Sequence, residues 1–236
     1  VVLCVCAAAL AYLGVWAALK QVVYVPLAFT QVSALGVALA FLGAELLNRA
    51  LGEAAHALHV PALLDPAVLS LVVTVSVSFY FARARDSGEN STVFAYLGCS
   101  ALFLILGGFL RSDIHGKDDI LFGNAVLVEA GQVRNVIVAL VAVALIHLRF
   151  FKRFLFVSLD REAAGAAGIR TYRAEVIFYS TLAVMISIAT RAIGALPVFG
   201  LAALPAMAAM RVGASMNRAF IAAPAIGIFC AACGYY

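Results

Sequence analysis

Charged residues are scarce in this sequence. Asp, Glu, Lys and Arg together make up 12% of the 236 residues, whereas hydrophobic residues make up 65% and the mean hydropathy is +1.07. In soluble domains, about a quarter of the residues are charged and about half are apolar. The composition therefore excludes an ordinary soluble domain and indicates a protein of the lipid bilayer.

Motifs for catalysis and nucleotide binding are also absent. The sequence contains no GxxxxGK[ST] loop to bind nucleotide phosphates, no HExxH and no GxSxG. At about 20 residues per spanning helix, a chain of this length crosses the membrane roughly seven or eight times and has no room for a soluble catalytic domain. We therefore expect an all-α, polytopic bundle of roughly eight spans that is not an enzyme, and we expect any nucleotide chemistry to belong to a partner chain.

Apolar runs bounded by charged residues predict the spanning helices. We expect them to form one transmembrane domain over residues 1–236, and we expect the sequence to be trimmed at both ends. The first run has no charged start and no cleavage site, which is typical of a spanning helix rather than a signal peptide. The predicted helices are 1–19, 22–47, 61–82, 92–110, 133–150, 174–190, 193–210 and 219–236.

Basic residues predict the orientation of these spans. The longest polar connection contains residues 152–173 and is rich in Lys and Arg, which indicates the cytoplasmic side. Alternating the crossings from this segment places eleven of the 16 basic residues inside. A basic inner rim that faces anionic lipid explains the net charge of +4, so no nucleic-acid partner is expected.

Acidic and histidine residues gather on the predicted outer side. Glu53, His56 and His59 are spaced by three residues, which brings them close together on a helix, and Asp118 and Asp119 lie at the outer mouth of the bundle. Imidazole and carboxylate groups suit a borderline divalent cation such as zinc. These residues indicate either an outer region that attracts metal or a solvated loop with incidental histidines.

The inner connection contains a regular pattern of small residues. Asp160, Ala164 and Gly168 follow one another at steps of four, which predicts a short helix with an acid at its start and a glycine at its end. Such a helix suits docking into a groove on another protein, and an ordinary connecting turn is the alternative.

Four segments together resemble the permease subunits of zinc- and manganese-type metal ABC transporters. The segment "SLDREAAGAAGI" resembles their cytoplasmic coupling segment, and "ILFGNAVLV" has their LFG triplet at 121–123. The segment "IGALPVFGLAALPAMAA" is similar to their Gly-rich helix that ends in Pro-Ala, here Pro205 and Ala206. The segment "LGVWAALKQVVYV" follows their opening pattern, although Gln21 replaces the second basic residue.

The resemblance implies an importer of zinc, manganese or iron in the cytoplasmic membrane of a prokaryote. Two permeases, identical or not, form the pathway, an extracytoplasmic solute-binding protein delivers the metal, and two cytoplasmic subunits bind and hydrolyse ATP. This chain itself then needs no cofactor. Asp160, Ala164 and Gly168 would couple the ATPase to the bundle, and five residues would bend or pack its helices: Gly123, Gly194, Pro197, Gly200 and Pro205.

The sequence departs from this family where metal ligands are expected. Typical members carry GDAxSHA, whose Asp and His lie one helical turn apart. Alignment without a gap places Leu27 at the Asp and Gln31 at the His, so neither ionisable ligand is present. Thr30, Gln31 and Ser33 remain as polar groups to line a pathway, and Leu27 offers no lone pair.

Three interpretations remain open. The chain is a metal-importing permease that handles the ion through other groups or through a second, different permease. It is a permease of the same architecture for an uncharged or chelated small substrate. Or it is a regulatory membrane subunit that does not transport and has lost the metal site.

Overall fold

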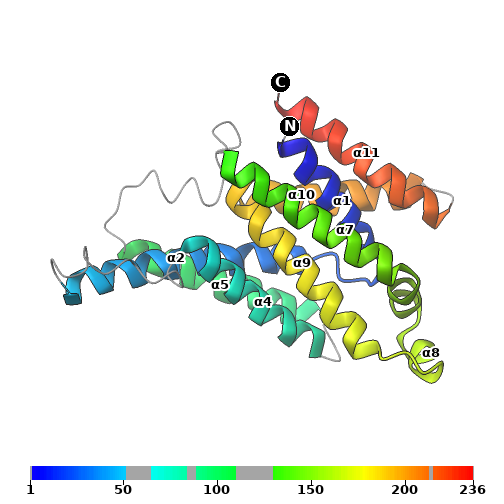
Figure 1. Ribbon diagram of the computed structural model, residues 1–236, viewed down its shortest axis with the longest axis horizontal. Helices are drawn as coiled ribbons and strands as arrows, with labels where there is room; N and C mark the ends of the chain where they lie inside the picture. Colours follow the sequence, from blue (N-terminus) through cyan, green and yellow to red (C-terminus); the bar gives the residue numbers. More distant parts are fainter. Residues whose placement is uncertain (1, 52–64, 84–88, 110–129, 213–214, 236) are drawn as a thin grey trace.

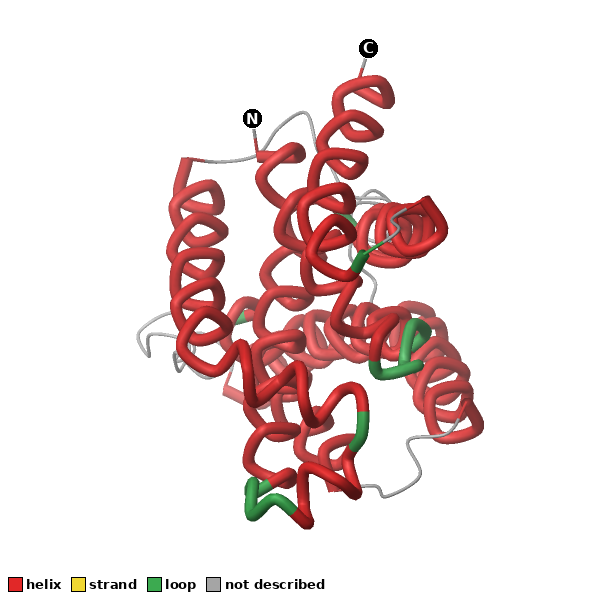
Figure 2. Tube along the Cα trace, turned by 90° about the vertical axis from the view of Figure 1, so that its right-hand side faces the viewer, coloured by secondary structure: helices red, strands yellow, loops and turns green. Residues whose placement is uncertain are grey.

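The computed structural model describes residues 2–51, 65–83, 89–109, 130–212 and 215–235, and every regular element within them is a helix (Figures 1 and 2). Eight of these helices are long and apolar enough to cross a membrane, which confirms the expected all-α bundle. The helices are α1 (Val2–Leu19), α2 (Val25–Leu51), α4 (Pro66–Arg83), α5 (Glu89–Phe109), α7 (Ala130–Leu159), α8 (Arg161–Ala166), α9 (Thr171–Ile193), α10 (Ala195–Val212) and α11 (Met216–Tyr235).

Helix α2 occupies the centre of the bundle. It packs against α4, α5, α9 and α10, which bury its first half, whereas Leu39, Phe41 and Leu46 in its second half are exposed. Helix α5, by contrast, packs mainly on α2 and leaves Phe94, Leu97 and Leu104 exposed, as expected for a surface that faces acyl chains. The first and last helices, α1 and α11, lie side by side (Figure 1).

Aromatic side chains from α1, α7 and α9 form the core. Trp16 is fully buried and its ring centroid lies 6.0 Å from those of Phe154 and His147. His147 is also fully buried, and its Nε2 atom lies 3.0 Å from Thr181 Oγ1. His147 therefore belongs to the packed core, which aromatic edge contacts stabilise beyond the burial of area.

Helix α7 is longer than the sequence analysis predicts. The predicted end at residue 150 is wrong, because the helix continues through Lys152 and Arg153 to Leu159. Phe154 and Val157 are buried on one face of this extension, while the basic side chains are exposed on the other. The extension is amphipathic, so it stays helical where a polar connection was expected.

Glycines allow two close helix contacts, at positions that the sequence analysis did not select. A Cβ atom at Gly36 of α2 would lie 2.6 Å from the Cα atom of Ser70 in α4, and one at Gly14 of α1 would collide with the carbonyl oxygen of Ala202 in α10. At Gly200, by contrast, a Cβ atom would meet nothing within 4 Å in the described part of the chain. Gly200 is therefore not a position of close packing here.

The other predicted bending residues lie at or near helix ends. Gly194 ends α9 with φ +88°, a conformation that glycine tolerates best, and its N–H donates to Thr190 O at 2.9 Å. Pro197 lies in the first turn of α10, where a missing N–H costs nothing, and Pro205 lies inside the same helix. Gly123 lies outside the described residues.

We predict that Gly36→Ala destabilises the bundle, because the added methyl group forces α2 and α4 apart. Overpacking of this kind costs about 1–3 kcal/mol. Gly98→Ala in α5 is the matched control, since its Cβ would meet nothing within 4 Å and the gain in helix propensity is the same. Thermal unfolding in detergent checks this expectation, and equal midpoints for the two variants would contradict it.

Candidate functional site

A buried row of hydroxyl groups joins three helices near the centre of the bundle. Ser33 Oγ of α2 donates to Ser187 Oγ of α9 at 3.4 Å, and Ser187 Oγ donates to Ser70 Oγ of α4 at 3.4 Å. All three side chains are buried. Among helices otherwise rich in Ala, Val and Leu, this serine cluster is a local polar region that carries no net charge.

The serine cluster continues along α4 toward the other end of the bundle. Thr74 and Ser78, one and two turns beyond Ser70, are also fully buried. Ser78 Oγ lies 3.4 Å from Ser180 Oγ of α9, and Thr74 Oγ1 donates to Ser70 O at 2.6 Å. The interface between α4 and α9 therefore carries neutral oxygens along most of its length.

The predicted pathway residues on α2 point into the protein rather than toward lipid. Thr30 and Ser33 are fully buried, Gln31 is 5% exposed and Leu27 is half-buried. Thr30 Oγ1 donates to Leu27 O at 2.7 Å, so its hydroxyl is held by its own helix. Of the four residues, Ser33 is the one that joins the serine cluster.

A cavity of about 190 Å³ opens beside the serine cluster, between α4, α7 and α9. Ser187 lies in its wall together with Asn135 and Arg191, and the remaining lining is apolar. A guanidinium group repels a bare divalent cation, whereas it attracts carboxylate or phosphate groups. The chemistry of this cavity is thus suited to a neutral or anionic small molecule.

Five residues indicated either a metal-attracting region or a solvated loop on the predicted outer side. Glu53, His56, His59, Asp118 and Asp119 lie outside the described residues. Among the residues that the structure does describe, no three His, Cys, Asp or Glu side chains come together in a group that could hold a metal ion.

The short helix predicted in the inner connection is present as α8. Asp160 caps it, since its Oδ1 atom accepts from Ala163 N at 2.8 Å. Ala164 is fully buried, whereas Gly168 is exposed with φ +79° and lets the chain turn toward α9. The three residues therefore start, anchor and terminate this segment.

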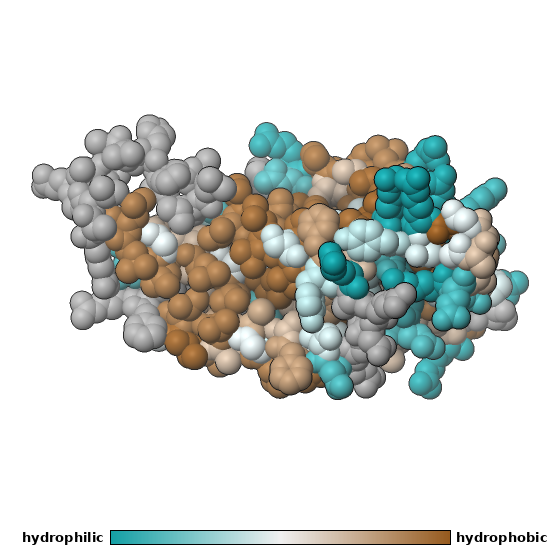
Figure 3. All heavy atoms as spheres, turned by 90° about the horizontal axis from the view of Figure 1, so that it is seen from below, coloured by the Kyte–Doolittle hydropathy of each residue, from teal (hydrophilic) through white to brown (hydrophobic). Residues whose placement is uncertain are grey.

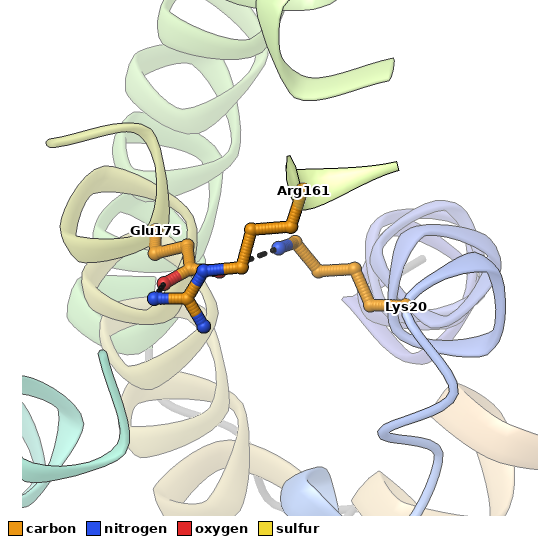
Figure 4. A network of polar contacts seen from close by, with 3 residues as sticks. All are labelled: Lys20, Arg161 and Glu175. Carbon is orange, nitrogen blue, oxygen red and sulfur yellow. Dashed lines mark ion pairs between the residues drawn. The ribbon is translucent and has the colours of Figure 1, made fainter. Parts of the chain in front are cut away.

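A buried carboxylate links this short helix to the rest of the bundle (Figure 4). Glu175 of α9 lies between two cations: its Oε2 atom is 3.0 Å from Arg161 Nη2, and its Oε1 atom is 3.7 Å from Lys20 Nζ. The side chains of Lys20 and Glu175 are each 8% exposed, and that of Arg161 is 38% exposed. We call these three residues the ion triad.

The ion triad ties α8 to the start of α2. Lys20 directly follows α1 and stands in the short turn that leads into α2, next to Gln21 with its φ of +60°. Its ammonium group also lies 5.3 Å from the centroid of the Phe178 ring. Burial lowers the pKa of Lys20, and the Glu175 carboxylate opposes this shift. The triad also places Lys20 and Arg161 at the same end of the bundle, as the predicted orientation requires.

Ser70, Ser187 and Glu175 were not predicted as site residues from the sequence. The spacing of Ser70, Thr74 and Ser78 at steps of four in an apolar run was a usable signal for one polar face of a helix. No local pattern identifies Glu175, because its partners Lys20 and Arg161 belong to other elements of the chain.

Comparison with known proteins assigns a family to this architecture. The family model described as the ABC 3 transport family matches residues 1–236. The manganese transport system membrane protein MntC of Listeria monocytogenes serovar 1/2a is 24% identical over 173 residues, which are 72% of this chain and 60% of that protein. The matched part of this chain thus spans less than two thirds of that relative.

Two solved structures share the fold. PsaBC from Streptococcus pneumoniae, in complex with a Fab, has a TM-score of 0.74 at 19% identity, and the match covers 97% of this chain and 76% of that chain. An inward-facing structure of an ABC transporter assigned to the metal-chelate type has a TM-score of 0.63 at 19% identity, covering 98% of this chain and 72% of that one.

We predict that Glu175→Gln destabilises the fold, because it leaves Lys20 and Arg161 without their shared carboxylate. Breaking a fully buried pair costs roughly 3–5 kcal/mol, and the partial exposure of Arg161 reduces this. Glu162→Gln is the control, since it removes an exposed acid on α8 that is not part of the ion triad. Thermal unfolding of both variants in detergent tests the role of the triad, which unchanged stability of Glu175→Gln would refute.

Proposed function

Since this chain belongs to the ABC 3 transport family, we propose that it is the permease subunit of an importer for a divalent metal ion or a metal complex. The observation that carries this proposal is the connection from α8 through the ion triad to α2. A helix at the inner end of the bundle, held by buried charges to the most central span, is suited to receive force from a partner and pass it inward.

The coupling follows from the contacts. Displacement of α8 moves Arg161, and the Glu175 carboxylate then pulls on α9 and on Lys20. Lys20 stands in the turn before α2, so the start of α2 shifts with it. Because Ser33 of α2 contacts Ser187 of α9, the shift changes the spacing of the serine cluster. Movement of α8 and access to the polar interior are thereby linked.

The serine cluster favours a cargo that keeps its own ligands. Removal of water from a divalent cation costs tens of kcal/mol unless other charges replace it, and serine hydroxyls carry no charge. Leu27 and Gln31 supply no carboxylate or imidazole either. We therefore propose that the ion crosses as a chelate or in hydrated form. Arg191, in the cavity between α4, α7 and α9, would attract the anionic groups of a chelate.

The proposed assembly contains several chains in the cytoplasmic membrane of a prokaryote. ATP is bound and hydrolysed by two cytoplasmic subunits, and an extracytoplasmic solute-binding protein delivers the cargo. A second permease, identical or not, completes the pathway. The names of the relatives support this assignment, since one describes manganese transport and another a metal-chelate type ABC transporter.

The neutral lining also suits a second candidate function, the transport of an uncharged small molecule. Ser33, Ser70 and Ser187 offer hydroxyl donors and acceptors to such a substrate as readily as to the outer shell of a metal complex. Transport assays separate the two candidates, because they require different added substrates.

For the transport assay, we expect the reconstituted complex with its solute-binding protein to hydrolyse ATP faster when a divalent metal or its chelate is added. Ser187→Ala should lower uptake about fivefold, as one neutral hydrogen bond of about 1 kcal/mol implies. Ser76→Ala is the control, because Ser76 is exposed and its hydroxyl donates to Val72 O of its own helix. Stimulation by uncharged solutes alone would favour the second candidate, and no stimulation by any substrate would refute a transport role.

For the coupling helix, we expect Asp160→Ala to weaken association with the ATPase subunits. The variant loses the cap of α8, and such caps contribute about 1 kcal/mol. Asp65→Ala is a matched control, since Asp65 Oδ1 accepts from Ala67 N at 2.7 Å at the start of α4, on the proposed outer side. Co-purification of the ATPase measures the effect. Equal yields from both variants would contradict the docking role of α8.

A further inference from the structure

A second and larger cavity, of about 550 Å³, lies at the inner ends of α7 and α9. Helices α7 and α9 form two of its walls, and the segment that joins α8 to α9 forms a third. Its volume falls in the range of about 300–1,000 Å³ that is typical of ligand sites. The residues that line it include Phe150, Arg153, Ile169, Arg170, Arg173 and Ile177. We call it the basic cavity.

Among the described residues, the wall of the basic cavity contains three arginines and no carboxylate. Arg153 comes from α7, Arg170 precedes α9 and Arg173 lies in its first turn. Glu175 directly follows the lining residue Ala174 in the sequence, but its two carboxylate oxygens already contact Lys20 and Arg161. The three arginines are therefore available to an anion, and guanidinium groups bind phosphate oxygens in pairs.

The remaining wall of the basic cavity is apolar. Phe150, Ile169 and Ile177 are half-buried and contribute carbon surface beside the guanidinium groups. A ligand that fills the site thus needs a negative group and an apolar part, which free phosphate does not have.

The position of the cavity matches a membrane interface. The spans Val133–Leu159 and Thr171–Ile193 both have their inner ends there. Hydrophilic residues gather at one end of the molecule seen from below, and apolar residues cover most of the remaining coloured surface (Figure 3). Basic groups between spans on the inner side are suited to the negative headgroups of the cytoplasmic leaflet.

We propose that the basic cavity binds an anionic phospholipid of the cytoplasmic leaflet. The phosphate contacts Arg170 and Arg173 from one side and Arg153 from the other, and an acyl chain follows the apolar surface of Phe150 and Ile177. The lipid then bridges α7 to the segment that leaves α8. This lipid site is separate from the proposed transport function. Both proposals assume the same orientation of the chain in the membrane.

Titration of the intact complex with phosphatidylglycerol, followed by native mass spectrometry in a mild detergent, tests this site. The double variant Arg170→Gln with Arg173→Gln should bind the lipid roughly twentyfold more weakly, since each basic group near an anionic surface contributes about a factor of five. The matched control is Arg211→Gln with Arg218→Gln, which removes two exposed arginines at the same end of the bundle, outside the cavity. The control variant should bind phosphatidylglycerol as the wild type does.

Three other results would overturn the proposal. Equal lipid binding by the two double variants would show that the cavity is not the site. Displacement of the lipid by inorganic phosphate at equal concentration would identify a site for phosphate alone. Loss of the ATPase subunits from the Arg170/Arg173 variant with unchanged lipid binding would assign the arginines to protein docking. Because the titration requires no transport, its outcome is independent of the cargo.

Discussion

The ion pairs of the Glu175 carboxylate are the interaction on which the α8 end of the bundle depends. The carboxylate lies between Arg161 at the start of α8 and Lys20 after α1, and thus joins α9 both to the preceding α8 and to a turn that is distant in sequence. A carboxylate that is buried to this extent is stable only when its charge is compensated, so the two cations must stay in place while it is ionised. The ion triad therefore restricts how α8 moves relative to α9 and to the start of α2.

The serine cluster complements this charged contact further inside the bundle. Ser33, Ser70 and Ser187 hold α2, α4 and α9 together without introducing charge into the membrane interior. Close approach of α2 and α4 is possible because Gly36 has no side chain to separate it from Ser70. Contacts of this kind between small and hydroxylated residues are common where helices pack in lipid. The same groups form a neutral polar interior beside the cavity between α4, α7 and α9.

Much of this arrangement was predictable from local patterns. The apolar runs predicted all eight spans, and Asp160, Ala164 and Gly168 predicted a short helix with a cap at its start and a glycine after its end. The end of α7 was missed because Lys152 and Arg153 were interpreted as part of a polar connection, although Phe154 and Val157 bury the opposite face. The close-packed glycines were also misassigned, since the shape of a neighbouring helix decides which glycine is in contact.

The sequence by itself determined the membrane environment, the number of spans and the absence of ionisable groups at Leu27 and Gln31, because each depends on residues close together along the chain. Only the tertiary structure decided that Glu175 pairs with Lys20 and Arg161, that Ser187 meets Ser33 and Ser70, and that three arginines share one cavity. The contacts of Glu175 with Lys20 and of Ser187 with Ser33 and Ser70 join residues that are distant in sequence. Their geometry follows from the way the helices pack, which hydropathy and spacing do not encode.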